Sequence, residues 1–96
     1  MSTYLILFRF TQQGIQNIKE SPARVRQAKD TFEKMGAHVK AFYTLMGRYD
    51  TAFIAEAPND ETLMKAIATV ASRGFVSSET LRAFTEEEFN KLIDEL

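Results

Sequence analysis

Hydrophobic and polar positions alternate along this chain in segments typical of strands and of helices. The run from Tyr4 to Phe10 is rich in β-forming residues and too short for a helix, so it predicts a first strand. The same pattern predicts strands over about His38 to Met46, Asp50 to Ala57 and Phe75 to Ala83. Four strands are therefore expected.

The first helix is predicted between the first two strands, because signals mark both of its ends. Ser21 is the expected N-cap, Pro22 suits the first helical position, and Gly36 follows the last turn. Apolar residues between these signals recur at spacings of three and four, which predicts one buried stripe. The stripe consists of Val25, Ala28, Phe32 and Met35.

Two further helices are predicted in the second half of the chain. Residues 58–60 end the third strand and cap a helix that Gly74 closes, with Leu63, Ile67 and Val70 as its apolar face. The last helix starts at a capping box: the Thr85 hydroxyl accepts from the Glu88 amide while the Glu88 carboxylate reaches back. Its apolar face is made of Phe89, Leu92, Ile93 and Leu96.

The predicted element order is β-α-β-β-α-β followed by a terminal helix. This order is typical of an α+β, ferredoxin-like fold, in which two helices cover one face of an antiparallel sheet. The expected strand order across that sheet is 4-1-3-2, with the first and third strands in the centre. We expect residues 1–96 to form a single domain.

The two central strands are apolar on both sides, which a sheet with one face in water should not be. In the first strand Ile6 and Phe8 point one way, and Leu5 and Leu7 point the other way. We therefore expect the open face to pair with a second copy, as a homodimer or a higher homo-oligomer. The terminal helix has two alternatives: it folds over its own open face, or it clasps the partner subunit.

Composition excludes several classes of function and leaves others open. The net charge of −1 and the pI near 5.8 argue against nucleic-acid binding. There are no cysteines, so disulfides and thiolate metal sites are excluded, and no metal or cofactor is expected. The apolar run at the start is too short for a membrane span and lacks the flanks of a signal peptide, so a cytoplasmic location is expected.

The four residues Gly47, Arg48, Tyr49 and Asp50 join the second and third strands and have two interpretations. They form either a polar hairpin turn, in which Gly47 supplies an unusual φ, or the rim of a binding site. The expected topology places Asp50 near Arg9 or Phe10, at the end of the first strand. Arg9 is a lone charge in an apolar strand, so it is predicted to pair with Asp50.

The connection from Thr11 to Ser21 is predicted to emerge at the same end of the sheet. It is longer than usual for its type, and Ile15 and Ile18 suggest one helical turn that closes over that end. Lys19 is then expected near the rim of the predicted site. His38, the one histidine, is expected to be exposed at the opposite end, with no second metal ligand at useful spacing.

The segments GRYD, EAP, TLRAFTEEEF and TQQGIQNIKESPAR together resemble the GYD domain family. The resemblance runs from Thr3 to about Leu96. It implies a ferredoxin-like fold of the dimeric α+β barrel type, and it implies no particular reaction. Related folds serve cofactor-free monooxygenases, isomerases, haem enzymes and ligand-sensing domains, and that likeness of fold selects none of them.

Two functional hypotheses follow. In the first, the chain binds an anionic or phenolic small molecule in a pocket between sheet and helices, and this hypothesis includes a cofactor-independent enzyme. Tyr49 or Asp50 would then act as acid or base. The residues expected to bind the ligand are Arg9, Lys19, Tyr43 and Arg48. In the second, the chain is a non-enzymatic assembly or ligand-sensing module whose sheet exists to build an oligomer.

Overall fold

The computed structural model describes all residues from Met1 to Leu96. Its elements follow the predicted order, with two short helices added before the first long one. They are β1 (Ser2–Phe10), α1 (Gln12–Gln16), the 3-10 helix η1 (Ile18–Glu20), α2 (Ser21–Lys34), β2 (His38–Thr44), β3 (Thr51–Ala57), α3 (Asp60–Ala71), β4 (Val76–Ala83) and α4 (Glu86–Asp94).

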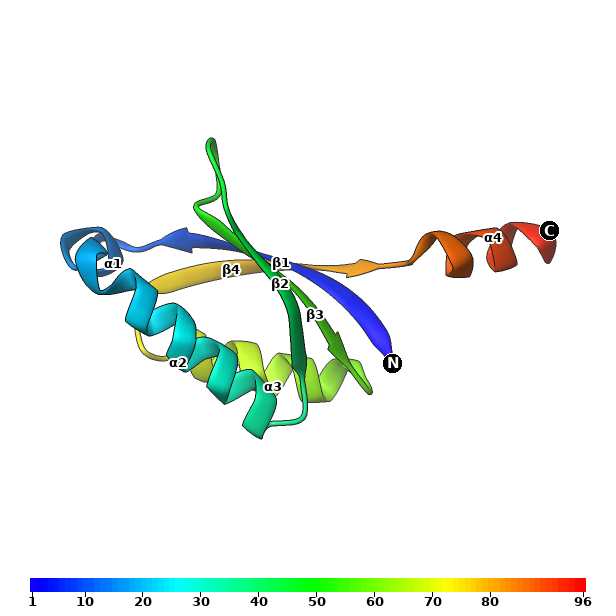
Figure 1. The fold of residues 1–96 in the computed structure, drawn as a ribbon, viewed down its shortest axis with the longest axis horizontal. Coiled ribbons are helices and arrows are strands. Elements are labelled where there is room, and N and C mark those ends of the chain that lie inside the picture. Colours follow the sequence, from blue (N-terminus) through cyan, green and yellow to red (C-terminus); the bar gives the residue numbers. More distant parts are fainter.

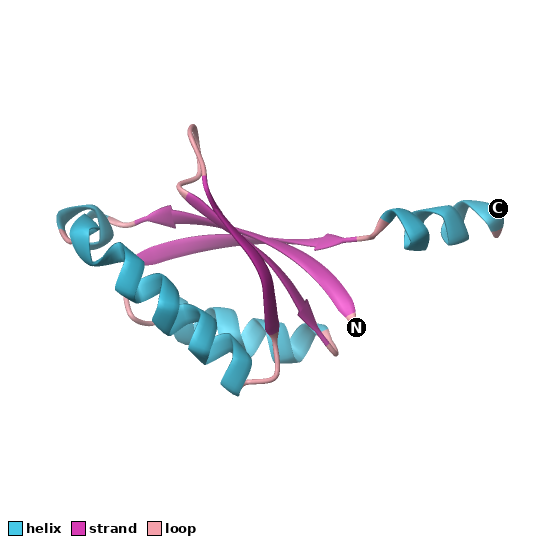
Figure 2. Ribbon diagram, viewed as in Figure 1, coloured by secondary structure: helices cyan, strands magenta, loops and turns pink.

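The four strands form one antiparallel sheet in the order β2-β3-β1-β4, which confirms the predicted 4-1-3-2 arrangement. Both long helices, α2 and α3, lie on one side of this sheet, and no element covers the other side (Figures 1 and 2). The fold is therefore ferredoxin-like, as predicted. We call the bare side the open face and the other side the covered face.

The core lies between the covered face and the two helices. Alternate residues of β1, namely Tyr4, Ile6 and Phe8, are almost completely buried there. Phe53 of β3 makes edge-on ring contacts with Phe8, Phe32 and Phe42, at centroid distances of 5.2, 5.3 and 5.9 Å. The predicted apolar face of α3 is buried as expected, with Leu63, Ile67 and Val70 all inside.

The predicted stripe of α2 is buried only in its middle. Ala28 and Phe32 are in the core, whereas Met35, after the last helical residue, is 36% exposed. The prediction of Ser21 as N-cap is wrong. Because η1 runs directly into α2, Ser21 is already helical, and the residue before it, Glu20, occupies the cap position without a side-chain hydrogen bond.

The connection between β1 and α2 contains the predicted helical turn as α1, but not the predicted closure. Ile15 and Ile18 remain 60% and 46% exposed. The backbone of α1, rather than these side chains, packs against the residue before β4. A Cβ added at Gly14 would lie 2.2 Å from the carbonyl oxygen of Phe75, so only glycine fits this approach. Thr11 stabilises the same contact, since its hydroxyl donates to the Gly74 carbonyl at 2.7 Å.

The last helix, α4, extends away from the sheet beyond the end of β4 (Figure 1). The alternative in which it folds over its own open face is therefore wrong for this chain. Its predicted capping box is confirmed: the Glu88 amide donates to the Thr85 hydroxyl at 3.1 Å, and the Thr85 amide donates to the Glu88 carboxylate at 2.9 Å. No helix of the chain combines the length and apolar character that a membrane span requires.

Candidate functional site

The turn between β2 and β3 is held by backbone hydrogen bonds and by one glycine. The Leu45 amide donates to the Asp50 carbonyl at 2.9 Å, and the Asp50 amide donates to the Phe8 carbonyl at 2.8 Å. Gly47 has a φ of +116°, which confirms the predicted need for glycine. Strand β2 ends at Thr44 rather than at Met46, because the hairpin opens here and leaves Met46 fully exposed.

Asp50 is half-buried, and its carboxylate binds backbone rather than a cation. Its Oδ2 accepts a hydrogen bond from the Phe10 amide at 2.8 Å. The β1–β3 ladder has its last pair at Phe8 and Thr51, so this carboxylate satisfies an amide that lies just beyond the ladder. The predicted position of Asp50 at the end of β1 is therefore confirmed, whereas its predicted pairing with Arg9 is wrong.

Arg9 reaches over the open face to the turn. Its Nε donates to the Arg48 carbonyl at 3.1 Å, and its guanidinium lies 5.3 Å from the centre of the Tyr49 ring. Arg9 is exposed, so its charge stays in water and requires no ion-pair partner. The turn is thus tied to β1 by Asp50 at the Phe10 amide and by Arg9 at the Arg48 carbonyl.

The remaining predicted ligand-binding residues lie apart from one another. Tyr43 is 58% exposed and pairs with Ala52, a register that places it on the open face. Lys19 is exposed in η1, and the Arg48 side chain is exposed in the turn. Of the six predicted site residues, only Asp50 lines either of the two main cavities, although Arg9, Arg48 and Tyr49 do come together.

A groove lies between α2, the connection before it and the β2–β3 hairpin. Its volume is about 550 Å³, which is within the range of ligand pockets. Of the predicted site residues, only Asp50 lines it. The lining is Phe10, Ile18, Ser21, Pro22, Val25, Arg26, Phe42, Thr44, Leu45, Asp50 and Thr51.

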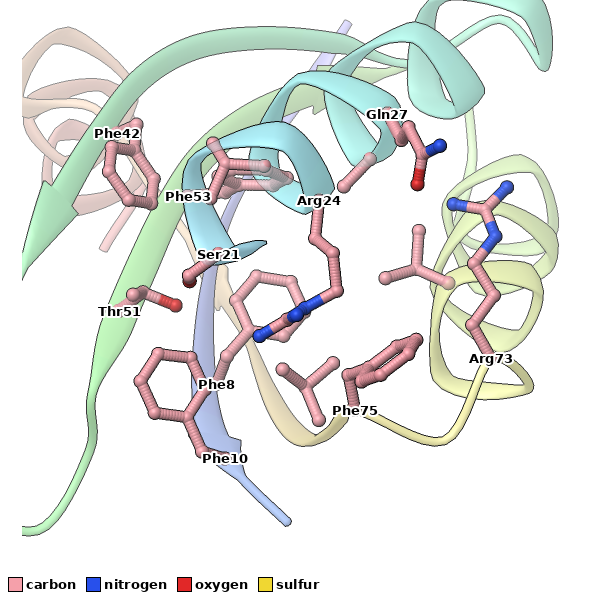
Figure 3. Close-up of a pocket in the computed structure, with 14 residues that line it drawn as sticks. Phe8, Phe10, Ser21, Arg24, Gln27, Phe42, Thr51, Phe53, Arg73 and Phe75 are labelled. Carbon is pink, nitrogen blue, oxygen red and sulfur yellow. The ribbon is translucent and has the colours of Figure 1, made fainter. Parts of the chain in front are cut away.

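A smaller cavity of about 60 Å³ adjoins this groove and contains Arg24, which sequence reasoning missed (Figure 3). The Arg24 guanidinium donates to the carbonyls of Asn17, at 2.9 Å, and Gly14, at 3.3 Å, and lies 4.4 Å from the Phe75 ring centre. Its donors are therefore used to hold the end of α1 against α2. Its position near the start of α2 was the available signal, since a cation there opposes the helix dipole.

Two groups elsewhere have shifted pKa values. Burial raises the pKa of the Tyr4 hydroxyl, and its hydrogen bond to the Asp60 carboxylate raises it further. The hydrogen bond from the Thr85 amide lowers the pKa of Glu88. No three carboxylate, histidine or cysteine side chains are placed to share a metal ion, and His38 contacts Glu33, with Nδ1 3.0 Å from Oε2.

The open face carries apolar side chains from three neighbouring strands. The register pairs Leu5 with Ile54 on one side and with Leu81 on the other, and Leu7 with Ala52. Leu5, Leu7 and Ile54 are only partly buried, by their neighbours within the sheet, and Leu81 is 44% exposed. Unlike the covered face, this surface has no helix above it.

Known proteins resemble this chain over most of its length. A curated relative, the glutamine synthetase and cystathionine beta-lyase binding protein of Thermus thermophilus, is 32% identical over 84 residues, which cover 86% of this chain and 88% of the relative. Two crystal structures share the fold: TTHA0845 from Thermus thermophilus (TM-score 0.58, 23% identity, 88% of this chain and 95% of that chain) and FFRP-DM1 (TM-score 0.59, 17% identity, 88% and 100%).

The match to a family extends over nearly the whole sheet and all of the long helices. The model of the GYD domain family matches residues 4–93, from Tyr4 of β1 to the last turn of α4. The GRYD turn that fastens β3 to β1 lies within this match. The chain therefore belongs to the GYD domain family.

Proposed function

We propose that this chain is a non-catalytic binding protein, which pairs with a second copy through its open face and as a pair associates with other proteins. The observation that carries the proposal is the apolar open face, centred on Leu5, Leu7 and Ile54. A monomer would leave this surface in water. A pair of such sheets, stacked face to face, would form the dimeric α+β barrel that the fold allows.

The size of the open face supports a stable pair. Four strands about 4.8 Å apart, each contributing about six residues at about 3.3 Å, make a face of roughly 400 Å² in projection. Two faces pressed together remove about 800 Å² from water, or on the order of 20 kcal/mol at about 25 cal/mol per Å² if all of it were apolar. Association costs about 4–15 kcal/mol, so a favourable balance remains within reach.

The side-chain geometry supports binding over catalysis. Asp50 and Arg9, two of the residues with chemistry to offer, are engaged in holding the turn. Tyr49 packs its ring beneath the Arg9 guanidinium. The curated relative is called a binding protein for two enzymes, which supports protein partners for this chain as well.

The pairing is tested by sedimentation of the purified full chain at micromolar concentration. A species of twice the 10.9 kDa chain mass is expected. A single 10.9 kDa species throughout the concentration series would overturn the proposed pairing.

The association with other proteins is tested with purified enzymes. The glutamine synthetase and the cystathionine beta-lyase of the organism that encodes this chain are immobilised, and binding of the full chain is measured by interferometry. Saturable binding to either enzyme is expected, with an unrelated enzyme as the control. Failure to bind both enzymes would remove these two as partners and would leave the pairing intact.

The groove beside α2 supports a second candidate, the binding of an anionic or phenolic small molecule. Its volume of about 550 Å³, its apolar walls and the cation Arg26 suit such a ligand. A thermal-shift screen with aromatic carboxylates and phenols tests this candidate. A hit should be lost in Val25→Trp, which fills the groove, and retained in Met64→Trp, on the exposed face of α3. No shift with either class of compound would remove it.

A further inference from the structure

Helix α4 presents an apolar face that nothing in its own chain covers. Phe89, Leu92 and Ile93, at spacings of three and four, are 54%, 46% and 48% exposed, and Leu96 beyond them is almost fully exposed. A helix of nine residues is marginal on its own in water, even with the capping box that starts this one. Such an amphipathic helix is expected to be stabilised by packing of its apolar face against a partner surface.

The polar side of α4 is strongly acidic. Its cations are limited to Lys91, whereas five carboxylates lie in or next to the helix. The carboxylates are Glu86, Glu87, Glu88, Asp94 and Glu95. A surface that receives α4 should therefore be apolar in the middle and basic at its edge.

The groove beside α2 has this character. Phe10, Pro22, Val25 and other apolar side chains form its walls, and the exposed Arg26 lines it without an ion-pair partner. Lys29 extends the basic edge, with its Nζ 5.6 Å from the centre of the Phe42 ring in the groove wall. The one carboxylate in the lining, Asp50, already accepts the Phe10 amide.

The groove and α4 of one chain lie at opposite ends of a molecule that is 49 Å long (Figure 1). A chain therefore does not fill its own groove. In the proposed pair, the two open faces meet about a two-fold axis that lies parallel to the sheets and perpendicular to the strands. The long axis of the second copy then points in the opposite direction. Its hairpin and groove then lie at the same end of the pair as α4 of the first copy.

We propose that α4 of each copy docks into the groove of the second copy, with Phe89, Leu92 and Ile93 against its apolar walls and its carboxylates toward Arg26 and Lys29. This inference rests on the proposed pairing of open faces, because the second copy supplies the groove. It gives each copy two reciprocal contacts in addition to the sheet. It also accounts for an apolar helix that extends from the sheet.

Cysteine cross-linking of the full chain tests the docking, since the natural chain has no cysteine. Leu45→Cys, in the groove wall, and Ile93→Cys, on α4, are made in separate chains, which are mixed, exchanged and oxidised. A covalent pair joined between positions 45 and 93 is expected, identified by mass spectrometry of the linked peptides. The control replaces Leu45→Cys by Met64→Cys, on the exposed face of α3, and should not link to position 93.

A double variant with both cysteines in one chain separates the other occupants. A link between 45 and 93 within one chain would mean that α4 folds back, and a dominant 93–93 link would mean that two α4 helices pair. Either result overturns the docking. A dimer in sedimentation that forms no 45–93 link also overturns it. In all three cases, sedimentation alone decides whether the sheets pair. A monomer in sedimentation overturns the pairing and the docking together.

Charge reversal gives an independent measurement. Arg26→Glu together with Lys29→Glu should slow the 45–93 cross-link by about fivefold, because exposed charge pairs contribute modestly. Adding Glu86→Lys and Glu87→Lys should restore the rate. An unchanged rate in the first pair of variants would overturn the assigned orientation of α4 in the groove.

Discussion

The two faces of the sheet are built from alternate residues of the same strands, yet they meet different surroundings. On the covered face Tyr4, Ile6 and Phe8 are at most 4% exposed, because α2 and α3 pack against them. On the open face Leu5 and Leu7 are shielded only by their neighbours in the sheet. Both long helices of the chain lie on one side, so the second apolar side has no cover within this chain (Figure 1).

The largest expected effect comes from breaking the covered face. Phe53→Ala removes the ring that touches Phe8, Phe32 and Phe42, and such truncations cost about 3–5 kcal/mol of unfolding free energy. Denaturant unfolding followed by circular dichroism measures the loss. Ile54→Ala, at the next residue and on the open face, is the matched control. It should lower the unfolding free energy of the chain by less than Phe53→Ala does. Equal losses at the two positions would contradict the distinction between the faces.

The next effect comes from breaking the open face while leaving the core alone. Ile54→Asp places an unpaired charge where two sheets are proposed to meet, which should weaken pairing by about 3 kcal/mol, or on the order of 100-fold. Sedimentation over a concentration series measures it. Met64→Asp, on the exposed side of α3, should leave the pair intact. A dimer that withstands Ile54→Asp would contradict the assignment of the interface.

Local chemistry explains why so much of the fold follows from the sequence. The alternation in β1 and the Thr85–Glu88 capping box depend only on residues close together in the chain, and both are confirmed. Ser21 is a suitable N-cap in isolation. The preceding residues already form η1, however, so the chain is helical when it reaches Ser21. The boundary depended on the path of the connection, which no local pattern specifies.

The candidate site was harder to predict because its side chains bind backbone. Opposite charges predicted that Asp50 and Arg9 would pair, but Asp50 accepts the Phe10 amide and Arg9 donates to the Arg48 carbonyl. Which backbone groups lack a partner depends on where the strands stop pairing. Arg24 likewise holds the carbonyls at the end of α1, a role that requires the folded connection. The roles proposed for Tyr43 and Lys19 in ligand binding stay predictions.

A smaller effect on the covered face depends on pH. The pKa of Tyr4 is raised by burial and by Asp60, so the stabilisation from its neutral hydroxyl is present below about pH 10 and is lost as pH rises through the folded-state pKa. Tyr4→Phe should cost about 1 kcal/mol at neutral pH and should flatten the loss of stability above about pH 10. Urea unfolding between about pH 8 and pH 11 measures both. Tyr43→Phe, on the open face, should change neither, and an unaltered slope in Tyr4→Phe would contradict the burial of this hydroxyl.

The smallest effect concerns α4, which lies outside both layers of the monomer. The Thr85 amide lowers the pKa of Glu88, so the cap stabilises α4 above the ordinary glutamate pKa of about 4.3 and loses this contribution as pH falls through the lower folded-state value. Glu88→Gln should keep the hydrogen bond but remove its acid titration. The amide chemical shift of Thr85, followed by NMR in acid, reports this one bond among many titrating carboxylates. Glu86→Gln, in the same turn but without a cap bond, should leave that titration in place. If the Thr85 amide shift has the same pH dependence in Glu88→Gln, another carboxylate causes that dependence. The start of α4 would then be stabilised by something other than the Glu88 cap.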